Sequence, residues 1–374
     1  MERDPKRDRG VLFAVGGTEI SPALLLVAVG IAVLALDLVR RLVFGDLTLA
    51  SLLTTLWTGL AIGLAVGLAG IGLSMTYSIL NFANFSHGDL VTTGAFTGWG
   101  AAYLVAGFGV GSLGELLLVR PRSGMVSPGA VGASIGQSPL AIVFGLLMAG
   151  ILTVVVSLII DRLVYKPMRN AGAIPILIAS IGVALVLRYV IQIVYGAREG
   201  RGVTDEPGSW QIPVGLGEVP INPHTAALVV VSLTLMAGLH ILLQYTKLGT
   251  AMRAMADNKD LAQVTGIPTE RVVLTTWVIG GALTGMAGFL IVLERGTIGF
   301  NIGWFLLLLI FAAVILGGIG SIYGAMAGGV IIGVFSELSL VWLPGEFGVP
   351  AAFAVMIVVL MVRPEGIFGG VTTA

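Results

Sequence analysis

The sequence predicts an all-α integral membrane protein, a polytopic helical bundle of about 8–10 transmembrane helices. Hydrophobic residues make up 56% of the 374-residue chain and charged residues 11%, whereas ordinary soluble domains carry about 25% charged residues. Long stretches lack Asp, Glu, Lys and Arg altogether, namely residues 47–88, 123–160, 272–293 and 296–336. A membrane helix needs roughly 20 mostly apolar residues, so these stretches hold several helices. The 54 glycines agree with the close helix packing that small residues allow in lipid.

Ten apolar segments are predicted as helices. Their ranges are 20–38, 52–74, 91–108, 140–160, 174–195, 226–243, 272–293, 304–318, 322–343 and 351–362. The first segment follows the basic residues Arg3, Lys6, Arg7 and Arg9. No small-x-small cleavage site is evident after it, so a retained first helix is favoured over a signal peptide. Residues 1–51 are therefore predicted as a cytoplasmic N-terminus with the first membrane helix, and residues 52–369 as the main transmembrane domain.

The distribution of basic residues predicts the orientation, because Lys and Arg concentrate in cytoplasmic loops. If residues 161–173 and 244–271 lie in the cytoplasm, alternation of the spans places both chain termini there as well. The cytoplasmic segments then hold 12 of the 20 Lys and Arg residues, and the outer segments hold 7. The long loops 109–139 and 196–223 lie outside. We therefore expect a multi-pass protein of the cytoplasmic membrane with both termini cytoplasmic.

Residues 244–271 form a charged loop between two apolar spans. Apolar and charged residues alternate over 250–264 as in a short amphipathic helix. Gly266 fits the C-cap of that helix, Pro268 forbids its continuation, and Thr269 can cap the next helix. A loop of this kind either rests on anionic lipid headgroups or binds a soluble partner, and the residues alone leave both open.

A second polar group of residues lies at 81–89, within an otherwise apolar region. It contains Asn81, Asn84, Ser86, His87 and Asp89. Polar side chains at membrane depth occur where they line a cavity or are buried in protein, and these could bind the ammonium and carboxylate of a zwitterion. The alternative, which the sequence favours slightly, is a helix end at the inner surface, capped by Asn84 and Ser86, with His87 exposed.

Two ionisable residues fall inside predicted spans, where charges are costly and often functional. Glu337 is expected in the middle of a span, either lining a pathway or serving as a structural partner for a helix amide or for Arg188. Arg188 itself is expected to extend its side chain to the outer interface. Gly317, Gly318 and Gly320 form a tight link between two spans, which packing and a hinge explain equally well.

Other classes of protein are excluded or disfavoured by composition. The chain has no Cys, which removes thiol catalysis, disulfides and thiolate metal sites. Its three His are widely spread, so no metal site is predicted. A net charge of zero gives no attraction for nucleic acid. No G-x-x-x-x-G-K-[ST] phosphate loop is present, so the chain is not itself an ATPase.

An ordered set of short motifs resembles the permease subunit of the high-affinity branched-chain amino acid ABC transporters. The motifs are Asn84-Phe85-Ser86-His87-Gly88-Asp89, Tyr165-Lys166-Pro167-Met168-Arg169, Lys247-Leu248-Gly249, Met252-Arg253-Ala254, Thr265-Gly266-Ile267-Pro268, Leu316-Gly317-Gly318-Ile319-Gly320-Ser321 with Gly324-Ala325, and Arg363-Pro364-Glu365-Gly366-Ile367-Phe368-Gly369. They span about residues 50 to 369 in the family's order. Where this chain has Ser86, the family usually has Ala.

The resemblance implies an importer driven by ATP hydrolysis in partner subunits, so that this chain is not an enzyme. Two ABC ATPases would bind the coupling loop, residues 244–271. A second, usually non-identical permease would complete the path within the lipid bilayer, and an external binding protein would deliver branched-chain or other hydrophobic amino acids. ATP and Mg²⁺ would bind the ATPases, with no cofactor in this chain. The residues implied in coupling are Lys247, Gly249, Arg253, Asp257, Gln263, Gly266, Ile267 and Pro268.

Three alternatives remain at this point. The first is an ion-coupled secondary carrier of small polar solutes, which would need several intramembrane acids or discontinuous helices. The second is an ABC permease for amides such as urea. The third is a membrane enzyme, which would need clustered catalytic side chains. Among the candidate pathway residues, Asn81, Asn84, Ser86, His87, Asp89 and Glu337, only Glu337 is a clear intramembrane acid.

Overall fold

The computed structural model describes residues 13–15, 18–20, 22–119, 126–215 and 217–369. The basic residues predicted to precede the first helix, 3–9, lie outside this part of the chain. Two compact units are present. The smaller comprises residues 1–53 and 213–219, and the larger comprises residues 54–212 and 220–374.

The smaller unit holds a short antiparallel strand pair, β1 (Phe13–Val15) and β2 (Thr18–Ile20), followed by helix α1 (Pro22–Phe44). Near the end of α1, Asp37 accepts hydrogen bonds from Arg40 (2.9 Å) and Arg41 (2.7 Å). The charges of α1 therefore lie in its last two turns, and the pairing of opposite charges three and four residues apart stabilises them modestly.

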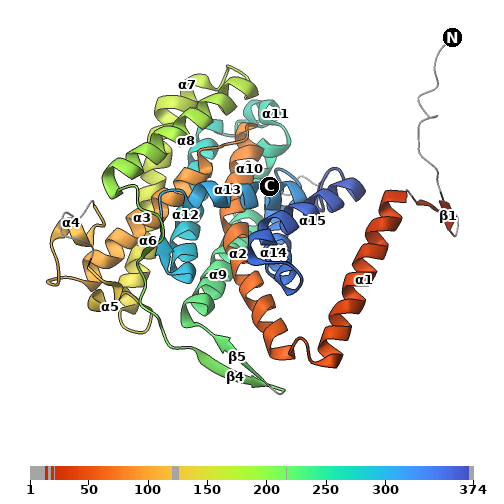
Figure 1. Cartoon of the computed structure of the whole chain (residues 1–374). Helices are drawn as coiled ribbons and strands as arrows, with labels where there is room; N and C mark the ends of the chain where they lie inside the picture. Colours follow the sequence, from red (N-terminus) through yellow and green to blue (C-terminus); the bar gives the residue numbers. More distant parts are fainter. Residues whose placement is uncertain (1–12, 16–17, 21, 120–125, 216, 370–374) are drawn as a thin grey trace, which may run out of the picture. The chain divides into compact units, whose positions relative to one another are not determined.

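The larger unit is built from helices, most of them long and apolar (Figure 1). The long helices are α2 (Leu49–Leu80, which starts in the smaller unit), α3 (His87–Ala106), α6 (Pro139–Ile160), α8 (Ala173–Tyr195), α9 (Pro223–Tyr245), α12 (Thr269–Arg295), α13 (Ile302–Gly317), α14 (Ile322–Leu338) and α15 (Gly348–Val362). The short ones are α4 (Leu113–Leu116), α5 (Pro128–Val131), α7 (Lys166–Met168), α10 (Lys247–Asp257) and α11 (Lys259–Val264). A π-helix, Asp161–Tyr165, links α6 to α7, and 3₁₀ turns cover Ser339–Val341 and Gly345–Phe347.

Short strands occupy the longer loops. β3 (Arg201–Gly202) pairs antiparallel with β6 (Thr297–Ile298), and β4 (Trp210–Val214) pairs with β5 (Gly217–Ile221). The predicted loop 196–223 is therefore partly ordered by strands, and the loop 109–139 by α4 and α5.

Each of the ten predicted helical ranges coincides with a helix of the structure. Within the described residues, seven helices are long and apolar enough to cross a membrane, α13 being shorter. The chain is thus a polytopic helical membrane protein, as predicted. The largest boundary differences are at the ends of α1 and α2, which each continue six residues beyond the predicted end, to Phe44 and Leu80.

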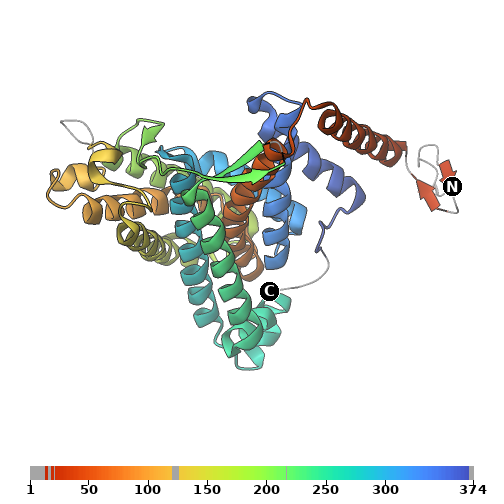
Figure 2. The ribbon, with the colours of Figure 1, turned by 90° about the horizontal axis from the view of Figure 1, so that it is seen from below.

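The charged loop also differs in detail from the prediction. The single helix expected over 250–264 is two helices, α10 and α11, because Asn258 ends the first with an extended backbone and caps the second. Thr269 was expected to cap α12, but Pro268 holds the N-cap position and no side chain caps that helix end. Figure 2 shows α9 and α12 side by side, with α10 and α11 forming the tip at their end.

The core of the larger unit lies around α3, which packs against both α6 and α12. Aromatic side chains fill it: Trp99 of α3 stacks on Phe289 of α12, with ring centroids 4.8 Å apart. Helix α3 approaches α12 so closely that a Cβ added to Gly94 would overlap the backbone of Gly285. Small residues at such crossings are how helices associate in lipid. Helices α2 and α12 are mostly buried, and α8 and α15 lie at the periphery.

Candidate functional site

The segment between α2 and α3 turns back into the helix bundle. Asn81 follows the last residue of α2 with a left-handed backbone, φ +55°, a conformation that Asn tolerates better than most residues. From there the chain returns until His87 Nε2 donates a hydrogen bond of 2.9 Å to the carbonyl of Ala69. Since Ala69 lies eleven residues before the end of α2, helix α3 begins about 16 Å above that end, at 1.5 Å per residue.

Buried hydrogen bonds hold this returning segment in place. The Asn84 Oδ1 atom accepts from the Ser86 backbone N–H (3.1 Å), the Ser86 hydroxyl (2.7 Å) and the Tyr165 hydroxyl (3.1 Å). The Phe85 N–H donates to Ser180 Oγ of α8 at 3.0 Å. The sequence-based alternative of a surface helix end with an exposed His87 is wrong, because His87 is 2% exposed and both Asn84 and Ser86 are fully buried.

One donor in this segment has no partner. Asn84 Nδ2 is buried and makes no hydrogen bond within the described residues. A buried polar group without a partner costs free energy and is uncommon in native proteins. It is therefore a position at which an external acceptor would gain a hydrogen bond.

The first turn of α3 also carries a buried ion pair. Arg188 of α8 donates from Nε to Asp89 Oδ1 at 3.1 Å and from Nη2 to Oδ2 at 3.0 Å. The Asp89 side chain is fully buried and that of Arg188 is 13% exposed. The Arg188 guanidinium also lies over the Trp304 ring, 4.3 Å from its centroid. Arg188 was expected to extend to the outer interface, but this partner holds it inside the protein.

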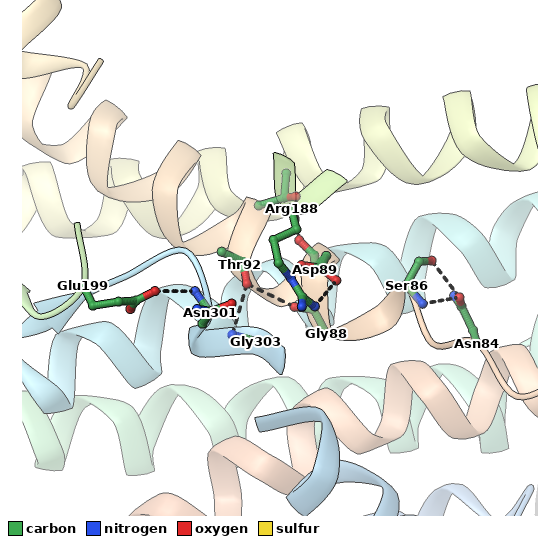
Figure 3. A network of polar contacts seen from close by, with 10 residues as sticks. Asn84, Ser86, Gly88, Asp89, Thr92, Arg188, Glu199, Asn301 and Gly303 are labelled. Carbon is green, nitrogen blue, oxygen red and sulfur yellow. Dashed lines mark hydrogen bonds and ion pairs between the residues drawn. The ribbon is translucent and has the colours of Figure 1, made fainter. Parts of the chain in front are cut away.

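The N-terminus of α13 meets the N-terminus of α3 at this place (Figure 3). The Gly303 N–H donates to Thr92 Oγ1 at 3.1 Å, and Thr92 Oγ1 donates to the Gly88 carbonyl at 3.3 Å. The two backbones are so close that a Cβ on Gly303 would overlap the Gly88 carbonyl. Just before α13, the Asn301 N–H donates to Glu199 Oε1 at 3.0 Å. Both helix ends bring positive partial charge into the bundle, although the first N–H groups of α13 already have acceptors within the protein.

The structure separates the six candidate pathway residues. Asn84, Ser86, His87 and Asp89 are all buried around this polar network, whereas Asn81, directly after α2, is exposed. Glu337 lies one residue before the end of α14, so the mid-span position expected for it is wrong. A Cβ on Gly59 of α2 would lie 3.2 Å from Glu337 Cβ. Gly59 is ten residues from Ala69 along α2, so Glu337 is about 15 Å from the network in that direction.

Four members of the network were not identified from the sequence: Arg188 as a partner, Thr92, Asn301 and Glu199. Arg188 and Asp89 did carry a signal, because they are opposite charges in apolar surroundings and such charges usually pair. Nothing in the sequence indicates the contacts of Thr92, Asn301 and Glu199, which depend on how α13 meets α3.

The charged loop folds as two capped helices. Thr246 Oγ1 accepts from the Gly249 N–H (3.1 Å) at the start of α10, and Asn258 Oδ1 accepts from the Leu261 N–H (2.9 Å) at the start of α11. Gly249 packs so tightly on Leu243 that an added Cβ would overlap its backbone. Gly266 has a left-handed backbone, φ +87°, with open space around it.

The two helices bury one face and expose the other. Met252, Met255 and Ala262 are buried, while Leu261 and Val264 of α11 are 61% and 85% exposed. The loop residues implied in coupling are divided by burial. Gly249 is buried, Arg253 and Ile267 are partly buried, and Lys247, Asp257, Gln263, Gly266 and Pro268 are exposed.

A chain of hydrogen bonds runs from α10 to the start of α14. Arg253 Nη1 donates to Gln244 Oε1 (2.8 Å), and Gln244 Nε2 donates to the Tyr323 hydroxyl (2.9 Å). The same hydroxyl contacts His240 Nδ1 at 2.7 Å. The loop is thereby connected to the first turn of α14, directly after the glycine link.

The glycine link between α13 and α14 is a packed junction. Gly318 and Gly320 have left-handed backbones, φ +104° and +89°. The C-terminal segment closes over the link, since Ile367 N–H and Phe368 N–H donate to the carbonyls of Leu316 and Gly317, both at 2.9 Å. On the other side, Ser78 Oγ of α2 donates to the Gly320 carbonyl at 2.7 Å. These contacts favour packing over a freely moving hinge.

No metal centre is formed by the residues that the structure describes, since no three His, Asp or Glu side chains gather there. The polar network holds two acids, Asp89 and Glu199, the base Arg188 and several neutral donors and acceptors. Such an arrangement suits the binding of a small polar or zwitterionic group more than acid–base chemistry.

Comparison with known proteins gives one family. Residues 55–362 match the family model described as "Branched-chain amino acid transport system / permease component". The chain is 33% identical over 304 residues to the high-affinity branched-chain amino acid transport system permease protein LivH of Escherichia coli (strain K12), covering 80% of this chain and 89% of that protein.

Two further relatives agree. The permease protein BraD of Pseudomonas aeruginosa, from a system of the same description, is 30% identical over 300 residues, covering 80% of this chain and 90% of BraD. A probable branched-chain amino acid transport permease protein LivH of Methanocaldococcus jannaschii is 30% identical over 313 residues, covering 80% and 87%. No solved structure matches the chain.

Proposed function

The chain belongs to the permease component family of branched-chain amino acid transport systems, and on that premise we propose that it is the membrane permease of an ABC importer. It moves branched-chain or other hydrophobic amino acids inward across the cytoplasmic membrane, driven by ATP hydrolysis in two partner ATPases. The observation that carries the proposal is the α10–α11 element, a folded, charged tip between two spans with an exposed apolar face.

The exposed face of α11 is the proposed contact with the ATPase. Leu261 and Val264 are three residues apart, on one side of the helix, and both are largely exposed. Burying these two side chains stabilises contact with a soluble protein more than contact with lipid headgroups. The reason is that the charged residues Lys259 and Asp260 lie in the same short helix. Apolar anchors surrounded by charges are typical of protein interfaces.

The hydrogen-bond chain from Arg253 through Gln244 to Tyr323 supports a route for coupling. Movement of α10 on the ATPase would shift the start of α14, and with it the junction at Gly317–Gly320. Energetic coupling between sites travels through such contacts when they join elements with two arrangements. Gly266 and Pro268 would keep α11 and α12 as separate helices that can move relative to each other, since neither residue favours a continuous helix there.

The network around α3 and α13 is the proposed site on the translocation path. Discontinuous helices whose N-termini meet inside a bundle bind anionic groups in other transporters. Asn84 Nδ2 and the positive N-terminus of α3 would bind the substrate carboxylate, with the dipole of α13 adding positive charge nearby, and Asp89 or Glu199 would bind its ammonium. Glu337, at the other end of α14 from the glycine link, is a separate candidate on the path.

The other components of the transporter are proposed from the family. A second permease, usually non-identical, would complete the path, and an extracytoplasmic binding protein would supply the substrate. ATP and Mg²⁺ would bind the ATPases, and this chain needs no cofactor. Both termini are proposed to be cytoplasmic, on the side of the coupling loop.

The test is to purify the tagged chain in mild detergent after co-expression with the ABC ATPases encoded in the same genome. ATPase subunits are expected to remain bound to the wild type and to be lost from a Leu261→Ser/Val264→Ser variant. The matched control is Trp210→Ser/Ile212→Ser, which removes two exposed apolar side chains of β4 and should retain the ATPase. A clean oligomer without ATPase would contradict the proposal and favour the ion-coupled carrier.

A further inference from the structure

A pocket of about 400 Å³ lies between the π-helix that ends α6 and the start of α12. Its charged lining consists of Asp161, Arg162, Lys166, Arg169, Glu270 and Arg271. The pocket is distinct from the polar network at α3 and from the exposed face of α11.

The acids of the pocket are already neutralised within the protein. Arg169 binds Asp161 at 3.0 Å and also binds Glu270 at 2.6 Å, while Lys166 Nζ lies 3.0 Å from Glu270. Within the described part of the chain, no ion pair or side-chain hydrogen bond is made by Arg162 or Arg271. Four cations therefore face two acids, and the pocket carries a net charge of about +2 that is available to an anion.

A buried donor adds to this excess. Arg169 Nε is buried and has no hydrogen-bond partner within the described residues, although Nη1 and Nη2 of the same guanidinium donate to Glu270 and Asp161. Arg162 lies on the π-helix Asp161–Tyr165, and π-helical turns are costly features that recur at functional sites.

The uncharged walls of the pocket indicate which anion fits. They are Leu158 of α6 and Leu274 of α12, both on membrane-spanning helices. Leu274 is 55% exposed, and Leu158 is partly exposed. In a bilayer these side chains contact acyl chains, whereas Arg162 and Arg271 lie at the ends of the spans, at the level of headgroups.

We propose that this pocket binds the phosphate group of an anionic phospholipid, held by Arg162 and Arg271. Basic pockets between the ends of membrane helices suit anionic headgroups, and the two leucines supply the apolar contact that a free phosphate ion would not use. Arg271 follows the Gly266–Pro268 turn directly, so a bound lipid fixes the start of α12 where the coupling loop ends. The inference does not depend on which solute is transported.

The experiment is native mass spectrometry of the full chain in detergent, titrated with phosphatidylglycerol or with zwitterionic phosphatidylcholine. The wild type is expected to retain phosphatidylglycerol preferentially. Each basic residue near a lipid surface contributes about a factor of five in affinity, so Arg162→Gln/Arg271→Gln should weaken retention roughly 25-fold. Arg162→Lys/Arg271→Lys should keep most of it.

The control removes the same charge away from the pocket. Lys247→Gln/Arg363→Gln changes two exposed cations that do not line the pocket and should retain phosphatidylglycerol as the wild type does. Equal loss in this control, or unchanged affinity in the Arg162/Arg271 glutamine variant, would overturn the site. If inorganic phosphate raises the melting temperature and phosphatidylglycerol is not preferred, the pocket binds a free phosphate ion and the lipid is ruled out as its ligand. A melting curve of each variant confirms folding.

Discussion

Arg188 of α8 and Asp89 of α3 form a bidentate ion pair inside the helix bundle, with hydrogen bonds of 3.1 and 3.0 Å. Because Trp304 of α13 lies 4.3 Å below the same guanidinium, one side chain connects three helices. The helices are otherwise joined near this point by the Thr92–Gly303 hydrogen bond. The pair therefore holds together the place where the N-termini of α3 and α13 meet.

Removing only the cation is expected to destabilise the protein. Arg188→Gln leaves Asp89 buried without its partner, which costs on the order of 3–5 kcal/mol. A double variant, Asp89→Asn/Arg188→Gln, removes both charges and should recover much of that loss, since a buried pair contributes little net stability over neutral groups. Thermal unfolding in detergent measures both. Equal or greater loss in the double variant would show that the pair is not the source of the effect.

The ten helices could be predicted because length and lack of charge determine a membrane span, whatever its neighbours. The pairing of Arg188 could not, because it joins residues 99 positions apart. Arg188 alone looks like a side chain that extends to the interface, and only the position of Asp89 in α3 shows otherwise.

The burial of His87 could not be predicted for a related reason. The segment 81–87 has the composition of a surface turn, with short polar residues and aromatics. Its polar groups instead bond to each other and to Tyr165, Ser180 and the carbonyl of Ala69. These partners come from three other helices, so the pattern along the sequence carries no trace of them.

Gly303 is expected to tolerate no side chain. A Cβ there would overlap the Gly88 carbonyl and lie 2.5 Å from Thr92 Oγ1, so Gly303→Ala forces α13 away from α3 and should abolish uptake or expression. The control is Gly182→Ala in α8, where no atom lies within 4 Å of the added Cβ. Ala in place of an exposed helical Gly stabilises by about 0.5–1 kcal/mol. Expression level and melting temperature are measured for both variants. If Gly303→Ala and Gly182→Ala behave alike, the close approach of α13 to α3 is contradicted.

Gly266→Val is expected to uncouple transport. The site has open space, so the effect comes from the backbone: φ +87° costs an ordinary L-residue about 1–2 kcal/mol, and a β-branched residue at least as much. Gly266→Asn should retain function, because Asn adopts this conformation more readily. ATP-dependent uptake of a labelled branched-chain amino acid measures the difference. Full uptake by the valine variant would contradict the assigned role of the turn.

Glu337→Gln is expected to lower uptake while leaving expression unchanged. Gln keeps the shape of the half-buried side chain but loses the charge, which at the end of α14 would attract the substrate ammonium. Loss of such steering lowers uptake at low substrate roughly tenfold, with little change at saturation. Glu346→Gln, an exposed acid in the following turn, is the control. Unchanged concentration dependence in Glu337→Gln would favour a purely structural role.

Tyr323→Phe tests the connection between the coupling loop and α14. The change removes the hydroxyl that His240 contacts at 2.7 Å and Gln244 at 2.9 Å, while the ring that packs beside His240 remains. If this hydroxyl transmits movement of α10, ATP hydrolysis by the assembled complex should continue while uptake falls.

The expected fall in uptake per ATP hydrolysed is roughly 5-fold or more, the lower range of typical coupling free energies. Tyr189→Phe is the matched control: it removes a hydroxyl from an exposed tyrosine of α8, at the periphery of the larger unit, and should change neither quantity. Because the described hydrogen bonds connect Arg253 to Tyr323 through Gln244, Gln244→Leu should reproduce the effect of Tyr323→Phe, and combining the two should add little. An additive double variant would show that the two side chains act separately and that the hydrogen-bond chain does not carry the coupling.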